Sequence, residues 1–277
     1  MCEVAIIGAG ELGGAIAFQL AKLDVARTVR LLDESGAVAR GKALDIAQSA
    51  PIEGFSTRIV GASSLFESAA ARVLVIADSA AGADGEPLAL LRRLSQLSTE
   101  SIIVCAGARH RELVEDATRE GLRTRQRILG SAPEAAASAL KALVALEANG
   151  SPNDVSITVL GVPPDQFVVP WEDATINGTP LARVLGDVSS RRLRRQAELI
   201  WPPGPLALAG AACRVVEGIL GGMRQRVSAF VAPDDSQGRR TRAAALPVYL
   251  GCDGIERIDP PALTVHDRVA LENAMVL

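Results

Sequence analysis

Histidine and aromatic residues are scarce in this chain. Among its 277 residues there are two histidines, His110 and His266, and aromatic residues make up 3% of the composition. This scarcity leaves few positions for an imidazole that acts as a general base or binds a metal. A core built from alanine, valine, leucine and isoleucine buries little area per residue, and association of subunits is one way to recover burial. We therefore expect a homo-oligomer.

Metal-site cysteine spacing and long apolar runs are also lacking. The four cysteines lie far apart at Cys2, Cys105, Cys213 and Cys252, which is typical of reduced thiols in the cytoplasm. No apolar run reaches the roughly 18 residues of a membrane-spanning helix, and the N-terminus leads into a strand rather than a signal peptide. The net charge is −3 with dispersed basic residues, which gives no basis for nucleic-acid or membrane binding. We expect a cytoplasmic protein without a metal site.

A glycine-rich turn lies near the start of the chain. Gly8, Gly10 and Gly13 follow the apolar run 4–7 and precede a helix-like stretch, and a second apolar run ends at Asp33. Gly8 permits the tight turn, Gly10 lets the backbone approach a pyrophosphate, and Gly13 lets the helix pack closely on the strand. The helix start, at Glu11 and Leu12, presents N–H groups to phosphates.

An acid at Asp33 accepts hydrogen bonds from a ribose 2′-OH and repels a 2′-phosphate, which favours NAD over NADP. The motif therefore predicts an NAD site. Its residues are Gly8, Gly10, Glu11, Leu12, Gly13 and Asp33. The alternative is a structural turn between strand and helix that binds no ligand.

Strand-like and helix-like segments alternate over the first half of the chain. This alternation predicts an α/β fold of the Rossmann type, with a doubly wound parallel sheet, over residues 1–132. After Pro133 the pattern changes to an alanine-rich helix (134–148), a strand (155–160), a long helix near 207–222 and further strands. Residues 133–277 are therefore expected to form an α+β domain. Three prolines and Gly204 break the chain before the long helix, because proline cannot lie inside one.

Several fragments resemble the lactate and malate dehydrogenase family. Residues 41–51 read GKALDIAQSAP, and residues 246–258 read LPVYLGCDGIERI. Both are similar to family segments, and Val159-Leu160-Gly161 and Val169-Pro170 bracket the position of the family's L-G-G-H-G-D segment. The resemblance covers nearly the whole chain. It implies an N-terminal Rossmann-type domain, a C-terminal substrate domain, NAD, and a dimer or tetramer.

In that family, a histidine oriented by an aspartate takes the proton of the substrate hydroxyl, and arginines hold the substrate carboxylate. The matching positions hold other residues here. The arginine positions of the mobile loop fall on Ala81 and Pro87, the aspartate and arginine of the D-x-x-R pair fall on Pro133 and Ala136, and the histidine falls on Pro163. Proline and alanine carry no titratable group, so the resemblance also implies that the family's catalytic residues are missing.

Other polar residues near these positions are candidates for altered chemistry. Arg109, His110 and Arg111 follow Gly107, which occupies the place of a family asparagine, and they form either a relocated catalytic cluster or the solvated start of a helix. Glu134 is expected to serve the first turn of a helix.

Two more polar residues have structural interpretations. We expect Asp165, which matches the acid of the histidine motif, to hydrogen-bond the loop backbone. His266 follows Thr264, which together with Asp267 predicts a capped helix start with His266 on the surface.

Two functional hypotheses follow from these matches. In the first, the protein keeps the fold and the NAD site and has lost the family reaction. In the second, it is an active oxidoreductase on a changed substrate that uses His110, Arg109 or Glu134.

Overall fold

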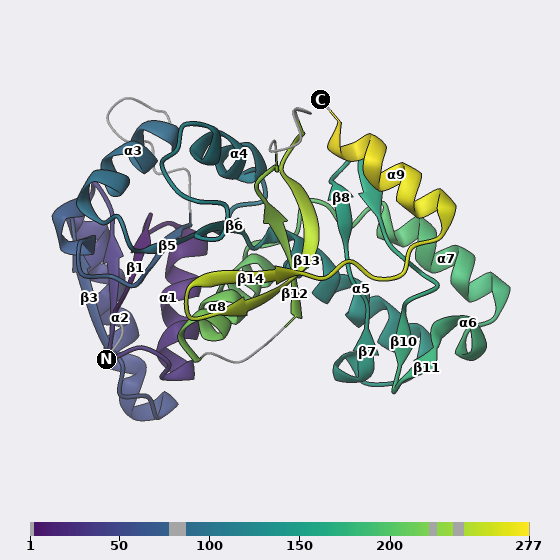
Figure 1. Ribbon diagram of the computed structural model, residues 1–277. Coiled ribbons are helices and arrows are strands. Elements are labelled where there is room, and N and C mark those ends of the chain that lie inside the picture. Colours follow the sequence, from purple (N-terminus) through teal and green to yellow (C-terminus); the bar gives the residue numbers. More distant parts are fainter. Residues whose placement is uncertain (1–2, 78–86, 222–225, 235–240, 277) are drawn as a thin grey trace.

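A large mixed sheet runs through the molecule (Figure 1). The computed structural model describes residues 3–77, 87–221, 226–234 and 241–276. The strands of the sheet are β1 (Glu3–Ile7), β2 (Thr28–Leu32), β3 (Arg58–Ala62), β4 (Val73–Ile76), β5 (Ile102–Cys105), β6 (Ile128–Gly130), β8 (Leu160–Val162), β9 (Gln166–Val168), β12 (Arg226–Val231), β13 (Ala244–Gly251) and β14 (Gly254–Ile258). Their order is β3-β2-β1-β4-β5-β6-β12-β13-β8-β9, and β14 pairs with β13.

The first six strands pair in parallel, as the alternation of strands and helices predicts. Side chains of consecutive strand residues point to opposite faces, so Val4 and Ile6 join one core cluster while Ala5 and Ile7 join the other. The helices of the first half are α1 (Glu11–Leu23), α2 (Gly36–Glu53), α3 (Pro87–Leu97) and α4 (Arg111–Arg119). Helices α1 and α2 contribute to the first cluster and α3 and α4 to the second, which is the doubly wound arrangement.

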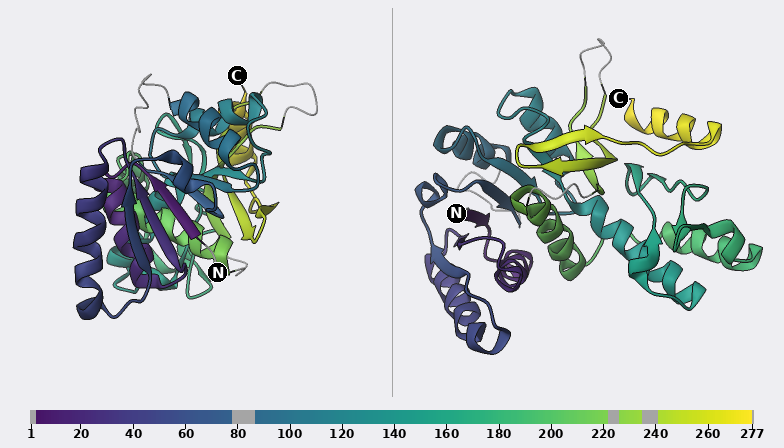
Figure 2. Two further views of the ribbon diagram at one scale, coloured as in Figure 1. Left: turned by 90° about the vertical axis from the view of Figure 1, so that its left-hand side faces the viewer. Right: turned by 60° about the horizontal axis from the view of Figure 1, so that its bottom comes forward.

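The second half of the chain extends the same sheet with antiparallel strands. Strand β12 pairs antiparallel with β6 on one side and with β13 on the other. Two long helices belong to this half, α5 (Ala132–Ala148) and α8 (Pro205–Gly221), and α8 packs against α1 of the first half (Figure 2). Pro205 is the first residue of α8, where the missing N–H costs nothing. The separation into domains 1–132 and 133–277 stays a prediction.

A small second sheet, three further α-helices and two short 3-10 helices, Leu65–Ser68 and Pro152–Asp154, complete the described elements. The sheet consists of β7 (Val155–Ser156), β10 (Thr175–Ile176) and β11 (Thr179–Pro180). The helices are α6 (Leu181–Val184), α7 (Asp187–Ala197) and α9 (Val265–Met275). No helix within the described ranges is long and apolar enough to cross a membrane.

One expected boundary was wrong. The single strand expected over 155–160 is divided, because β7 belongs to the small sheet and β8, which starts at Leu160, belongs to the large one. Helix α2 continues past Pro51 to Glu53. A proline removes one backbone donor, and here it lies in the last turn, where Pro51 and Ile52 are exposed.

Candidate functional site

The glycine turn joins the end of β1 to the start of α1. Gly8 has φ +99°, which a residue with a side chain rarely adopts. A Cβ added to Gly13 would lie 1.8 Å from the carbonyl oxygen of Gly8, so only glycine permits this approach of helix and strand. Gly10 is the N-cap of α1, and no side chain caps the first turn. The helix N-terminus therefore presents its backbone dipole at this turn.

Asp33 lies beside the same turn. One carboxylate oxygen accepts the Ala9 N–H at 2.7 Å, and the other accepts the Ser35 N–H at 2.9 Å. These two bonds fix the carboxylate at the end of β2, at the carboxyl edge of the sheet next to the glycine turn. Its position suits the acid that binds a ribose in dinucleotide sites.

The first two residues of α1 differ in their exposure. Glu11 is exposed, whereas the side chain of Leu12 is buried in the core, so only the backbone of Leu12 faces the turn.

Lys42 also lies at this turn, although no sequence motif had marked it. Its ammonium donates a hydrogen bond to the Gly10 carbonyl, which places a cation from α2 at the glycine turn. The GKALD segment was the available signal, but spacing alone does not show that a lysine 32 residues away reaches Gly10.

The residues around the turn fit an NAD molecule. A dinucleotide requires three features that are present here. They are a glycine turn whose space a Cβ would fill, a helix start without a side-chain cap, and a carboxylate held in place. Lys42 adds a positive charge where phosphates would lie.

A second feature lies at the end of β5, at the same carboxyl edge of the parallel strands. It is a cavity of about 420 Å³, within the usual range for small-molecule sites. Its lining residues come from four separate segments: Ala108, Arg109, Arg111, Glu112, Pro163, Pro164, Trp201, Pro202 and Phe230. Pro163, the residue on which the expected histidine position falls, is part of the lining, and the described residues of the lining include no histidine, cysteine or lysine.

An aromatic pair forms part of the cavity wall. The rings of Trp201 and Phe230 meet edge to face with centroids 5.9 Å apart, a favourable geometry. Phe230 is buried against Gly130, where an added Cβ would lie 2.9 Å from the phenyl ring. No sequence motif marks either aromatic residue, because Trp201 and Phe230 lie 29 positions apart in the chain and meet only in the fold.

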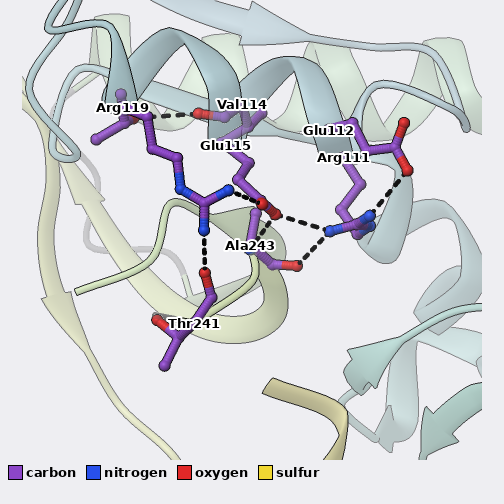
Figure 3. A network of polar contacts seen from close by, with 8 residues as sticks. Arg111, Glu112, Val114, Glu115, Arg119, Thr241 and Ala243 are labelled. Carbon is purple, nitrogen blue, oxygen red and sulfur yellow. Dashed lines mark hydrogen bonds and ion pairs between the residues drawn. The ribbon is translucent and has the colours of Figure 1, made fainter. Parts of the chain in front are cut away.

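Arg111 serves a structural network rather than the cavity (Figure 3). Its guanidinium pairs with Glu112 at 3.0 Å and with Glu115 at 2.9 Å. Glu115 is buried, also pairs with Arg119, and accepts the Ala243 N–H at 2.9 Å. The network therefore ties α4 to the chain segment that enters β13.

His110 and Arg109 have different surroundings. The His110 side chain is buried, and its Nδ1 accepts the Gly107 N–H at 3.0 Å, so the ring folds back over its own turn. The lining of the cavity includes Arg109 but not His110. Arg109 is exposed and makes no hydrogen bond or ion pair with the described residues. The structure therefore brings only Arg109, of these two candidates, to the cavity.

Glu134 does more than occupy the first turn of α5. Its carboxylate is buried, accepts the Ser228 N–H at 2.8 Å and pairs with Arg214 at 3.3 Å and Lys141 at 4.0 Å. Burial raises the pKa of this carboxyl, and the two cations and the hydrogen bond oppose that rise. Glu134 lines a groove between α1, α5 and α8 and not the cavity at Pro163.

The remaining candidates have surface or structural positions. Thr264 caps α9 by accepting the Asp267 N–H at 3.1 Å, and His266 is exposed, as expected. Asp165 was expected to hydrogen-bond the loop backbone. Its side chain is exposed and makes no hydrogen bond with the described residues. Pro133 is buried in the first turn of α5, and Pro87 begins α3. Ala81 and the loop 80–86 lie outside the described residues.

Neither the two buried thiols nor a metal cluster offers alternative chemistry in the described part of the chain. Burial raises the pKa of Cys105 and of Cys213 to about 12, so both thiols stay protonated and unreactive at neutral pH. Within the same part of the chain, no group of three or more histidine, cysteine, aspartate or glutamate side chains lies close enough to hold a metal ion.

Comparisons with known proteins extend over nearly the whole chain. No protein-family model matches it. A malate dehydrogenase of Thioalkalivibrio sulfidiphilus is 28% identical, covering 99% of this chain and 96% of that protein. A malate dehydrogenase of Dehalococcoides mccartyi is also 28% identical over 93% of this chain and 91% of that protein.

Solved structures show the same fold. The malate dehydrogenase of Salinibacter ruber superimposes with a TM-score of 0.89 at 23% identity, covering 98% of this chain and 93% of that one. The lactate dehydrogenase of Cryptosporidium parvum, solved with lactic acid and nicotinamide adenine dinucleotide, gives a TM-score of 0.88 at 20% identity, covering 99% and 94%. These structural likenesses confirm the predicted fold class, and over nearly its whole length the chain is similar to malate dehydrogenases.

Proposed function

We propose that this protein binds NAD and does not carry out the hydride transfer typical of the lactate and malate dehydrogenases. The observation that carries the proposal is the cavity at Pro163. Its titratable lining residues are Arg109, Arg111 and Glu112, and Arg111 and Glu112 are paired with each other. Removal of a 2-hydroxy acid's proton needs a base that titrates near neutral pH. Among the described residues of the lining, none is a histidine, and the one carboxylate, that of Glu112, is paired with Arg111.

NAD binding is supported by the glycine turn, by Asp33 and by Lys42. In addition, the lactate dehydrogenase of Cryptosporidium parvum, which shares the fold, was solved with this cofactor. When bound, NAD accepts or, as NADH, gives a hydride. The residues of this chain would bind it: the start of α1 would hold the phosphates, and Asp33 would bind the ribose and repel a 2′-phosphate.

The position of His110 favours this proposal over an active oxidoreductase with relocated residues. Its ring is buried over Gly107 and is not part of the cavity lining, and the guanidinium of Arg109 has donors but no acceptor atom for a proton. Glu134 lies in a different groove. We also propose that the protein forms a homo-oligomer and is located in the cytoplasm.

The test combines a binding and a turnover measurement. NADH should bind, by fluorescence or calorimetry, while oxaloacetate and pyruvate give no measurable oxidation of NADH. General acid–base groups contribute about 10²–10⁴-fold to rates, so turnover should fall below detection without the histidine and the arginines.

Two outcomes would contradict the proposal. Absence of NADH binding would remove the cofactor from it. Oxaloacetate reduction that survives in the His110→Ala variant would show that the family reaction persists and that His110 does not support it.

A further inference from the structure

Among the described residues, the cavity at Pro163 combines an apolar wall with one cation that has no ion-pair partner, Arg109. Pro163, Pro164, Pro202 and the aromatic pair Trp201 and Phe230 supply most of the wall. Trp201 is partly exposed, so its ring retains surface that a ligand can cover. A wall of this kind binds the apolar body of a small molecule, since burial of apolar surface is favourable.

The positive charge of the lining determines which polar group of a ligand the cavity can bind. The guanidinium of Arg111 is held between Glu112 and Glu115 and contacts the carbonyl of Ala243. Arg109 is the cation of this lining that has no ion-pair partner among the described residues. A guanidinium binds a carboxylate through two parallel hydrogen bonds.

The same lining disfavours a second negative charge. Glu112 belongs to the cavity lining, and its side chain is 77% exposed although it pairs with Arg111. A dicarboxylate would place its second charge among apolar walls or near Glu112, where desolvation and repulsion both act against it.

We propose that this cavity binds a monocarboxylate with an aromatic or comparably apolar body. Arg109 holds the carboxylate, and Trp201 and the prolines cover the body. The inference goes beyond the proposed function, and it does not depend on NAD being bound, because none of the residues of the glycine turn lines the cavity.

Calorimetric titration of the full chain without NAD tests the ligand class. The probes are phenylacetate, its neutral isostere phenylacetamide, acetate and succinate. Phenylacetate should bind with a dissociation constant in the millimolar range or tighter. Phenylacetamide and acetate should each bind at least about tenfold more weakly, because one lacks the charge and the other lacks the apolar body. Succinate should also bind at least about tenfold more weakly.

Two variants test the assignment of Arg109. Arg109→Met keeps the length of the side chain and removes its charge, and it should weaken phenylacetate binding about tenfold or more while leaving phenylacetamide binding nearly unchanged. Arg195→Met is the matched control: Arg195 is also exposed and lies on α7, outside the cavity lining. It should change neither affinity. Thermal melting of both variants checks that they fold.

The inference is overturned if phenylacetate shows no saturable binding, if succinate binds as tightly, or if folded Arg109→Met binds phenylacetate like the unchanged protein. The result is separable from the NAD titration. Phenylacetate binding without NADH binding would refute the proposed function and support this inference. NADH binding without phenylacetate binding would support the proposed function and refute this inference.

Discussion

At the scale of single residues, Pro163 places a side chain that cannot exchange a proton in the wall of the cavity. The residue is buried and lines the cavity together with Pro164. Its neighbours do not compensate, because His110 turns back onto Gly107 and Asp165 is exposed without a hydrogen bond to the described residues. A cavity with these side chains can bind a small molecule, and no histidine is among the described residues of its lining.

Asp33 decides the choice of cofactor in this proposal. Asp33→Ala should weaken NADH binding about tenfold or more, because a hydrogen-bonded charged group is lost, and should reduce discrimination against NADPH. Competitive titration with both cofactors measures the effect. Asp33→Asn is the companion variant, since it keeps an acceptor for Ala9 and removes the repelling charge. If discrimination stays the same in both variants, Asp33 does not belong to the site.

The buried carboxyl of Glu134 gives stability a distinctive pH dependence. Its pKa is raised, chiefly by burial, so the folded state binds a proton more readily than the unfolded one. The free energy of unfolding should therefore fall as the pH rises from the ordinary glutamate value through the raised one. Glu134→Gln should remove this part of the decline, as measured by urea unfolding at a series of pH values.

Glu147 on the same helix provides an opposite control. Hydrogen bonds from Arg192 and Ser189 lower the pKa of its carboxyl, so its contribution is present above the ordinary glutamate pKa and is lost as the pH falls. Glu147→Gln should leave the decline at rising pH intact. A decline that persists in Glu134→Gln would exclude Glu134 as its source.

At the scale of elements, α4 is fastened to the start of β13 through one buried carboxylate. Glu115 binds Arg111, Arg119 and the Ala243 N–H, and Arg119 also donates to the Thr241 carbonyl at 2.7 Å (Figure 3). These contacts join segments more than 120 residues apart in the chain. They explain why Arg111, next to the cavity, serves the fold.

Neutralising Glu115 should therefore destabilise the protein. Glu115→Gln should lower the free energy of unfolding by about 1.5–3 kcal/mol, because charged hydrogen bonds within a buried network are lost. Glu112→Gln, an exposed partner of the same Arg111, should cost at most about 1 kcal/mol. Urea unfolding of both variants at neutral pH compares them. Equal losses would show that burial of Glu115 has no energetic consequence.

At the scale of the whole molecule, apolar surface remains uncovered. On α2, Leu44 is 60% exposed and Ile52 is 88% exposed. A groove of about 800 Å³ between α1, α5 and α8 has Phe18 and Leu206 in its lining. Exposed apolar surface of this kind commonly marks an interface between subunits.

We expect the protein to sediment as a dimer or tetramer in analytical ultracentrifugation. Leu44→Asp should shift the equilibrium toward the single chain, because it places a charge on this apolar surface. Glu53→Asp, also on α2, is the control that keeps the charge pattern. Sedimentation at the single-chain mass over the whole concentration range would refute the expectation.

The sequence by itself determined the features that depend on residue identity and local backbone geometry. The glycine turn requires Gly8 and Gly13 for conformational and steric reasons, and the strand–helix alternation predicts parallel pairing. The proline at position 163, on which the family's histidine falls in the sequence match, is a matter of identity alone. These features can be recognised without knowing which distant segments meet.

Only the tertiary structure decided which polar residues are available for binding. The sequence treats Arg109, His110 and Arg111 alike. The fold places Arg111 against Glu115, folds His110 over Gly107 and leaves Arg109 at the cavity. It also buries the Glu134 carboxylate, which accepts the backbone N–H of Ser228, 94 positions away. Such contacts depend on the packing of remote segments, and local periodicity contains no information about them.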